Sequence, residues 1–147
     1  MARETEILGL SELSDLLQNE TKKHATDYLR RVAVSAGKVA QAAMEDTAPV
    51  ATGRLESEIV VKSKFSGGAD ETTLTVEIGP SKDTWYSIFS EFGTVGQEGT
   101  DKHGRHFRHA ATPAQHWIAR AWEGCQEDVL NEFYRKAIEL LMRLEKK

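Results

Sequence analysis

Apolar residues recur at intervals of three and four positions in two long stretches of this sequence, one near each end. The first stretch covers residues 11–46, and the second begins near Thr112 and can extend to the C-terminus. Such spacing places apolar side chains along one face of an α-helix. The sequence therefore predicts two long helices, with the other elements of the fold between them.

The first helix has recognisable signals at its ends. Ser11 suits the N-cap position, where its hydroxyl can accept a hydrogen bond from a free backbone N–H group. Pro49 ends the helix, because the residue before a proline is displaced from helical backbone angles. Gly37 is the weak position inside it, because glycine costs about 1 kcal/mol relative to alanine in a helix. A break near Asn19 is also compatible with the pattern.

The second helix opens on the strongest local signal in the sequence. Thr112 suits the N-cap, Pro113 suits the first helical position, and Gln115 completes a capping box. Cys125 falls on the apolar face of this helix, so we interpret it as a packed residue rather than a nucleophile. That face consists of Ile118, Ala121, Trp122, Cys125, Val129, Phe133, Ala137, Ile138, Leu141 and Leu144.

Two segments between the helices alternate apolar and polar residues, as half-buried β-strands do. They are residues 58–65 and 72–79, and their short connection predicts an antiparallel hairpin. Residues 4–8 can add an edge strand. The predicted fold class is α+β, in one domain over residues 1–147: a long N-terminal helix, a small antiparallel sheet of three to four strands, a short aromatic helix and a long C-terminal helix.

The short helix is predicted over residues 85–92, where large apolar side chains are crowded together, and Gly93 can supply its left-handed C-cap. One interpretation is that the cluster covers the open edge of the sheet. A two-turn helix has no room to bury all of these side chains, however, so we expect some to contact a partner subunit. The candidate subunit interface consists of Trp85, Tyr86, Phe89, Glu91, Phe92, Gly93 and Thr94.

Residues 95–111 contain three glycines and few apolar residues, so we predict a long, mobile loop. Two alternative functions depend on it. A small metal-dependent nuclease or hydrolase would use its histidines as ligands, and a nucleic-acid-binding module would use its cations. We favour neither, because a loop gives no scaffold for three imidazoles and three cations attract phosphate only modestly. The candidate partner-facing or DNA-facing residues are Lys102, His103, Arg105, His106, Arg108 and His109.

Composition narrows the class of protein further. The formal net charge of −4 does not suggest a general nucleic-acid binder. One cysteine excludes an intramolecular disulfide and is compatible with a reducing cytoplasm. No apolar run reaches the roughly 18 residues that span a membrane, and the N-terminus lacks a signal-peptide core. No acidic residue is marked out as a general acid or base, so we expect no catalytic residue, metal or cofactor.

Several segments, in their order and spacing, carry a resemblance. The most specific set is Val76-Glu77-Ile78-Gly79-Pro80, then Tyr86 with Phe89, then Glu91-Phe92-Gly93-Thr94. The others are Gly9-Leu10 with Leu13 and Leu17, Ala48-Pro49 with Thr52-Gly53-Arg54-Leu55 and Ile59, and Ala114-Gln115-His116-Trp117-Ile118 with Ala121. Together, from Gly9 to about Glu123, they resemble the small tail-component proteins of long-tailed bacteriophages that are encoded in the head–tail joining region.

The sequence departs from this family's pattern in three places. His116-Trp117 replaces the usual Pro-Phe, and Arg120 replaces the proline before Ala121. The segment over residues 96–109 is also longer than the family leads us to expect. No role is therefore transferred to residues of that segment.

The resemblance implies a structural virion protein of a tailed phage or prophage, acting as a neck or tail-completion ring subunit at the head–tail junction. Its partners would be other copies of itself, in a ring that can form as late as assembly, and phage head-connector, head-closure and tail proteins. DNA would only pass through the lumen, which the net negative charge would assist, and no membrane would be involved. The expected location is the virion, after synthesis and assembly in the bacterial host cytoplasm. The family has no established catalytic residues, so no enzymatic activity and no cofactor are implied.

Overall fold

The computed structural model describes residues 22–49, 53–67 and 73–145. The predicted strand at residues 4–8, the predicted N-cap Ser11 and the break near Asn19 lie outside them. The described elements are, in order, α2 (Lys22–Thr47), α3 (Arg54–Ser57), β1 (Ile59–Ser66), β2 (Thr73–Pro80), a 3₁₀ turn (Lys82–Thr84), α4 (Ser87–Phe92), β3 (Gln97–Thr100), β4 (His106–His109) and α5 (Trp117–Glu145). The α+β class and the order of long helix, sheet, short helix and long helix are confirmed.

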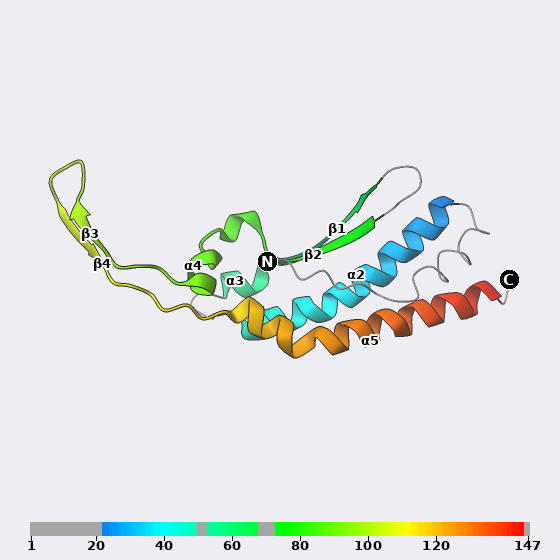
Figure 1. The fold of residues 1–147 in the computed structure, drawn as a ribbon. Coiled ribbons are helices and arrows are strands. Elements are labelled where there is room, and N and C mark those ends of the chain that lie inside the picture. The colour runs from blue at the N-terminus through cyan, green and yellow to red at the C-terminus, as the bar shows by residue number, and fades with distance from the viewer. Residues whose placement is uncertain (1–21, 50–52, 68–72, 146–147) are drawn as a thin grey trace.

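The two long helices lie side by side and run antiparallel (Figure 1). One buried cluster joins Val32 and Ala36 of α2 to Phe133 and Ala137 of α5. A second cluster joins the other ends of the two helices and consists of Met44, Ala48, Leu55, Ile59, Trp117 and Ala121. Alanines at these contacts let the two helix axes approach closely, and the apolar stripes predicted from the sequence meet there.

The β1–β2 hairpin packs against α2, and its register runs from Ile59 opposite Pro80 to Ser66 opposite Thr73. Gly37 favours this close packing, because a Cβ at that position would lie a tight 3.1 Å from Cγ1 of Val61 and 3.1 Å from Cγ1 of Val76. Gln41 Nε2 also donates a hydrogen bond to the Ile59 carbonyl at 2.8 Å. The glycine that weakens the helix is therefore the residue that lets the sheet approach it.

Two predictions about residues 95–116 are wrong. The predicted loop contains a second hairpin, β3–β4, so the four described strands form two separate two-stranded sheets rather than one. The last helix begins at Trp117 rather than at Pro113, and the predicted caps Thr112 and Gln115 precede it in extended chain. Thr112 instead pairs with Thr94 in an isolated bridge, five residues before the helix begins.

Candidate functional site

α4 is amphipathic in the reverse of the usual sense. Its buried residues are Ser87 and Glu91, while large apolar side chains face solvent. We call the exposed set the aromatic patch, and its members with their exposed fractions are Trp85 (67%), Ile88 (54%), Phe89 (44%) and Phe92 (68%). Trp85 and Phe89 meet edge to face, with ring centroids 5.6 Å apart. Contiguous exposed apolar surface of this kind marks an interaction site in soluble proteins.

The buried side of α4 is held to the start of α5 by Glu91. Its carboxylate accepts the Ile118 N–H through Oε2 at 2.8 Å and the Ala119 N–H through Oε1 at 3.3 Å. The first N–H groups of a helix lack partners within the helix and carry partial positive charge, so they suit a buried carboxylate. Glu91, only 6% exposed, thus supplies the N-cap that the sequence assigned to Thr112.

Further hydrogen bonds fix the same junction. Gln115 N–H donates to the Ser90 carbonyl at 2.9 Å, and His116 N–H donates to the Glu91 carbonyl at 3.1 Å. The indole N–H of Trp117, which is fully buried, donates to Ser90 Oγ at 3.2 Å. α4 therefore has a fixed orientation on α5, and the aromatic patch is presented as a set surface.

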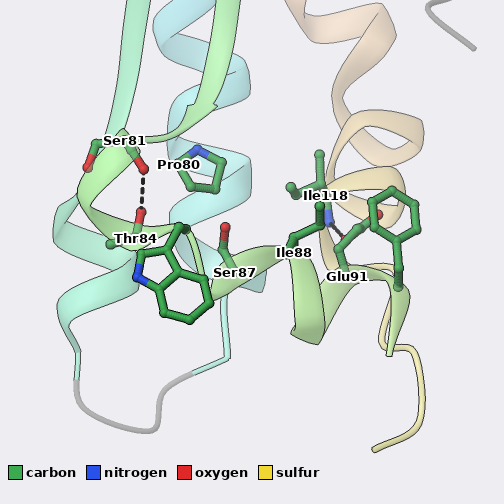
Figure 2. A pocket seen from close by; sticks show the side chains of 9 residues that line it. Pro80, Ser81, Thr84, Ser87, Ile88, Glu91 and Ile118 are labelled. Carbon is green, nitrogen blue, oxygen red and sulfur yellow. Dashed lines mark hydrogen bonds between the residues drawn. The ribbon is translucent and has the colours of Figure 1, made fainter. Parts of the chain in front are cut away.

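A shallow depression runs along the patch, between α4, the end of β2 and the first turn of α5 (Figure 2). Trp85, Ile88, Phe92 and Ile118 provide most of its apolar lining, and its volume is about 330 Å³. Glu91 lies at its side but is engaged by α5, as the dashed line in Figure 2 shows. Thr84 is engaged likewise, because its hydroxyl donates to the Ser81 carbonyl at 2.9 Å. The depression suits apolar side chains of a partner, because the polar groups of Glu91 and Thr84 are engaged within the fold.

The β3–β4 hairpin forms the outer part of a ribbon over residues 94–112, which we call the arm; it extends away from the helices (Figure 1). Its base is closed by Thr94 and Thr112, which exchange backbone hydrogen bonds of 2.9 and 3.0 Å. Gly93 precedes it with φ 75° and ψ 179°, a conformation that essentially only glycine adopts. A Cβ at Gly93 would also lie 2.6 Å from the Thr112 carbonyl oxygen. Gly93 is the C-cap of α4, as predicted, but its ψ of 179° lies outside the left-handed helical conformation expected there.

The tip of the arm is an ordered turn. Asp101 accepts the N–H groups of His103 and Arg105 on its carboxylate, at 2.8 and 2.9 Å. Gly104 has φ 78° and donates its N–H to the Asp101 carbonyl at 3.0 Å. Aspartate at the first position and glycine at the fourth are favoured in such turns. Asp101-Lys102-His103-Gly104 was therefore a readable hairpin signal that the sequence prediction missed.

The three histidines of the arm do not converge. His103 lies in the turn, while His106 and His109, three positions apart on β4, point to opposite faces of the ribbon. Among the described residues no three His, Cys, Asp or Glu side chains are grouped as a metal site would require. All six candidate residues of this segment are exposed, including the cations Lys102, Arg105 and Arg108.

The predicted interface residues do lie together at α4 and the base of the arm. Trp85, Phe89 and Phe92 are exposed, Tyr86, Gly93 and Thr94 are half-buried, and Glu91 is buried. Ile88 and Val95 are exposed beside them, although the predicted set omitted both. Whether this surface contacts another subunit stays a prediction.

Cys125 is buried on α5, and its thiol lies 3.7 Å from the Trp122 carbonyl oxygen, to which it donates. Burial, together with the nearby Asp128 carboxylate, raises the pKa of the thiol. A thiol with a raised pKa forms less of the reactive thiolate. The interpretation of Cys125 as a packed residue is confirmed.

A family model described as "Bacteriophage HK97-gp10, putative tail-component" matches residues 11–93 of the chain. The matched range contains α2, the β1–β2 hairpin and α4, and it ends where the arm begins. No curated protein and no solved structure matches the chain. No helix within the described ranges is long and apolar enough to cross a membrane.

Proposed function

Since this chain belongs to the HK97-gp10 family of bacteriophage tail components, we propose that it is a structural subunit of the virion that acts at the head–tail junction. In this proposal several copies form a neck or tail-completion ring, which contacts head-connector or head-closure proteins on one side and tail proteins on the other. The subunit works by assembly and breaks no covalent bond.

The observation that supports this proposal is the reversed amphipathicity of α4. A helix that hides Glu91 and exposes Ile88, Phe89 and Phe92 leaves apolar surface in water unless a partner covers it. Full burial of a side chain of this size is worth roughly 1.5–3 kcal/mol, so covering the half-exposed patch gives on the order of 5 kcal/mol per contact. That gain is repeated at every subunit contact of a ring.

A closed ring also needs two different contact surfaces on each copy, because each subunit meets its neighbours head to tail. The chain offers a second exposed apolar surface in the far half of α5. Tyr134, Ile138 and Met142 follow one another at intervals of four residues there, so they lie along one side of the helix. Two separate apolar surfaces are consistent with heterologous contacts of a ring subunit.

The proposal can be tested in the phage or prophage that encodes the chain. We expect a deletion of the gene to leave filled heads and completed tails that do not join, as electron microscopy of lysates would show. Complementation with the double variant Trp85→Ser/Phe92→Ser should fail to restore joining. The matched control Thr75→Ala/Glu77→Ala changes two exposed residues on the outer face of the β1–β2 hairpin and should restore it.

Both variants alter exposed side chains, so their thermal unfolding should match that of the natural chain. Mass spectrometry of purified particles should find the protein in joined virions only. Normal joining without the gene, or joined particles that lack the protein, would overturn the proposal. Normal joining with the patch variant would remove its main support.

A further inference from the structure

The arm has regular structure without a core of its own. No residue from 95 to 116 is buried, and only Gly99, Asp101 and Phe107 are half-buried. The Phe107 ring covers Gly99 across the hairpin, at 3.0 Å from the place a Cβ would take, which stiffens the ribbon. An isolated two-stranded hairpin is marginally stable at best in water. A stiff arm that buries nothing within its own chain therefore has the properties of a surface that is completed by a partner.

The charge of the arm is opposite to that of the rest of the chain. Residues 97–109 contain three cations and two carboxylates, a formal charge of +1, which leaves −5 for the remainder. One of the two carboxylates, Asp101, is engaged in the turn. The outer end of the arm therefore presents Lys102, Arg105 and Arg108 to solvent.

α5 holds a matching surface of the opposite sign. Glu123, Glu127 and Asp128 are exposed in its first half, within two turns of one another, and we call them the acidic strip. Ion pairs of α5 lie further along the helix, between Glu132 and Glu139. Like charges four residues apart, such as those of Glu123 and Glu127, disfavour the helix. A cationic partner would remove this repulsion.

We propose that the arm of one copy lies across the first half of α5 of the next copy, with Lys102 and Arg105 of its tip against the acidic strip. The inference rests on the proposed ring, and it names the contact that orders the subunits around it. The nine residues from Thr94 to Lys102 are eight steps of extended chain and span about 26 Å, which is close to the width of a small domain. Along α5 the strip occupies about 8 Å, and Lys102 and Arg105 lie at the turn that forms the tip of the arm. Arg108, three positions beyond Arg105, points to the opposite face of the ribbon.

DNA is the competing occupant, and the charges of the whole chain argue against it. Three cations release few counterions, so they bind a duplex weakly at physiological salt. The −5 charge of the remaining residues would repel DNA that approached the arm closely. A second copy instead presents the acidic strip itself.

A charge swap tests the contact in the complementation assay. The arm variant is Lys102→Glu/Arg105→Glu/Arg108→Glu, and the strip variant is Glu123→Lys/Glu127→Lys/Asp128→Lys. Each alone sets like charges against each other in every subunit contact, so the number of joined particles should fall about tenfold or more. The chain with all six changes restores opposite charges and should join heads to tails again. The control Lys38→Glu/Lys62→Glu/Lys64→Glu reverses as many exposed charges elsewhere and should behave normally.

A direct readout is zero-length carbodiimide cross-linking of purified virions. A cross-link between Lys102 and Glu123 or Glu127 is expected from the natural chain between copies, and none from either single-surface variant. Normal joining with the arm variant would overturn the inference about the arm. The proposed ring would still stand in that case, provided that the Trp85→Ser/Phe92→Ser variant failed to join heads to tails in the same assay. DNA would replace the second copy as the occupant if two results were found together. The six-change chain would fail to join heads to tails, and the arm variant would lose a salt-sensitive binding of DNA that the natural chain shows.

Discussion

The two hairpins of this chain have the same connectivity and opposite surroundings. β1 and β2 are eight residues long and set one face against α2, where Gly37 lets them approach closely. β3 and β4 are four residues long and have no buried residue on either face. The difference shows that the first hairpin belongs to the core, whereas the second depends on its own strand pairing, its turn, Phe107 over Gly99 and its closed base.

The family match follows the same division. It covers the hairpin that belongs to the core and the helix that exposes the aromatic patch, and it ends at residue 93, where the arm leaves the body. We infer that the core hairpin sets stability and that the arm acts on partners. Substitutions in the two hairpins should therefore separate these two properties.

The largest expected difference in stability is between alanine substitutions of Ile59 and of Phe107. Ile59 is buried in the cluster that joins α2 to α5, so Ile59→Ala should lower the free energy of unfolding by about 2–5 kcal/mol. Phe107 packs mainly on Gly99 of the arm, so Phe107→Ala should lower it by less than about 1 kcal/mol. Urea denaturation followed by circular dichroism measures both. Equal losses would show that the arm is part of the same cooperative core.

The next effect is expected at the base of the arm. Gly93→Ala combines a forbidden backbone conformation with a Cβ that meets the Thr112 backbone, and should cost about 1–3 kcal/mol or more. The control is Gly104→Ala at the tip, which has a similar φ but open space around its Cβ. Gly104→Ala should destabilise only the tip of the arm, and the thermal unfolding midpoint of the chain should be almost unchanged. Similar midpoints for both variants would contradict a base that is anchored to the body.

Glu91 should have a smaller effect on stability. Glu91→Ala removes the cap of α5 and should cost about 0.5–2 kcal/mol. Glu91→Gln keeps one acceptor oxygen, so it should lower the free energy of unfolding by less than Glu91→Ala does. Tryptophan fluorescence should also change in the alanine variant, because α4 and its Trp85 lose their fixed orientation on α5. An unchanged spectrum together with unchanged stability would show that the patch is oriented by other contacts.

The smallest expected effect is a pH dependence of stability, and it arises between α2 and α5, away from both hairpins. Hydrogen bonds from Arg135, and more weakly from Ser35, hold the pKa of Glu132 below its ordinary value of 4.5. A carboxyl with a lowered pKa in the folded state adds stability above pH 4.5, and this stability is lost as the pH falls through the folded value. Glu132→Gln should therefore be slightly less stable than the natural chain at pH 7, with the difference shrinking below pH 4.5. A difference that grows on acidification would contradict this assignment.

The parts of the fold that were predictable are those in which burial imposes a pattern. α2 and the β1–β2 hairpin follow from periodic apolar residues, and Pro49 follows the last turn of α2 closely. The arm has no buried face, so its strands show no alternation of apolar and polar residues. The only sequence signal for this hairpin is the Asp101–Gly104 turn. The start of α5 was misplaced because its cap, Glu91, comes from another helix 27 residues before Ile118.

The candidate site was predictable for a similar reason. An excess of aromatic side chains over what a short helix can bury was visible in the sequence, and Trp85, Phe89 and Phe92 are indeed exposed. The direction of each side chain was not, because it depends on which side of α4 meets α5. Glu91 was predicted at the interface, yet it faces α5 and is buried there.

A cryo-electron microscopy reconstruction of the head–tail junction of the phage particle tests the central claim most directly. We expect a closed ring of this chain in which the α4 surface is covered by protein and each arm rests on α5 of the adjacent copy. A junction without this chain, or a ring in which α4 and the arm both face solvent, would contradict it.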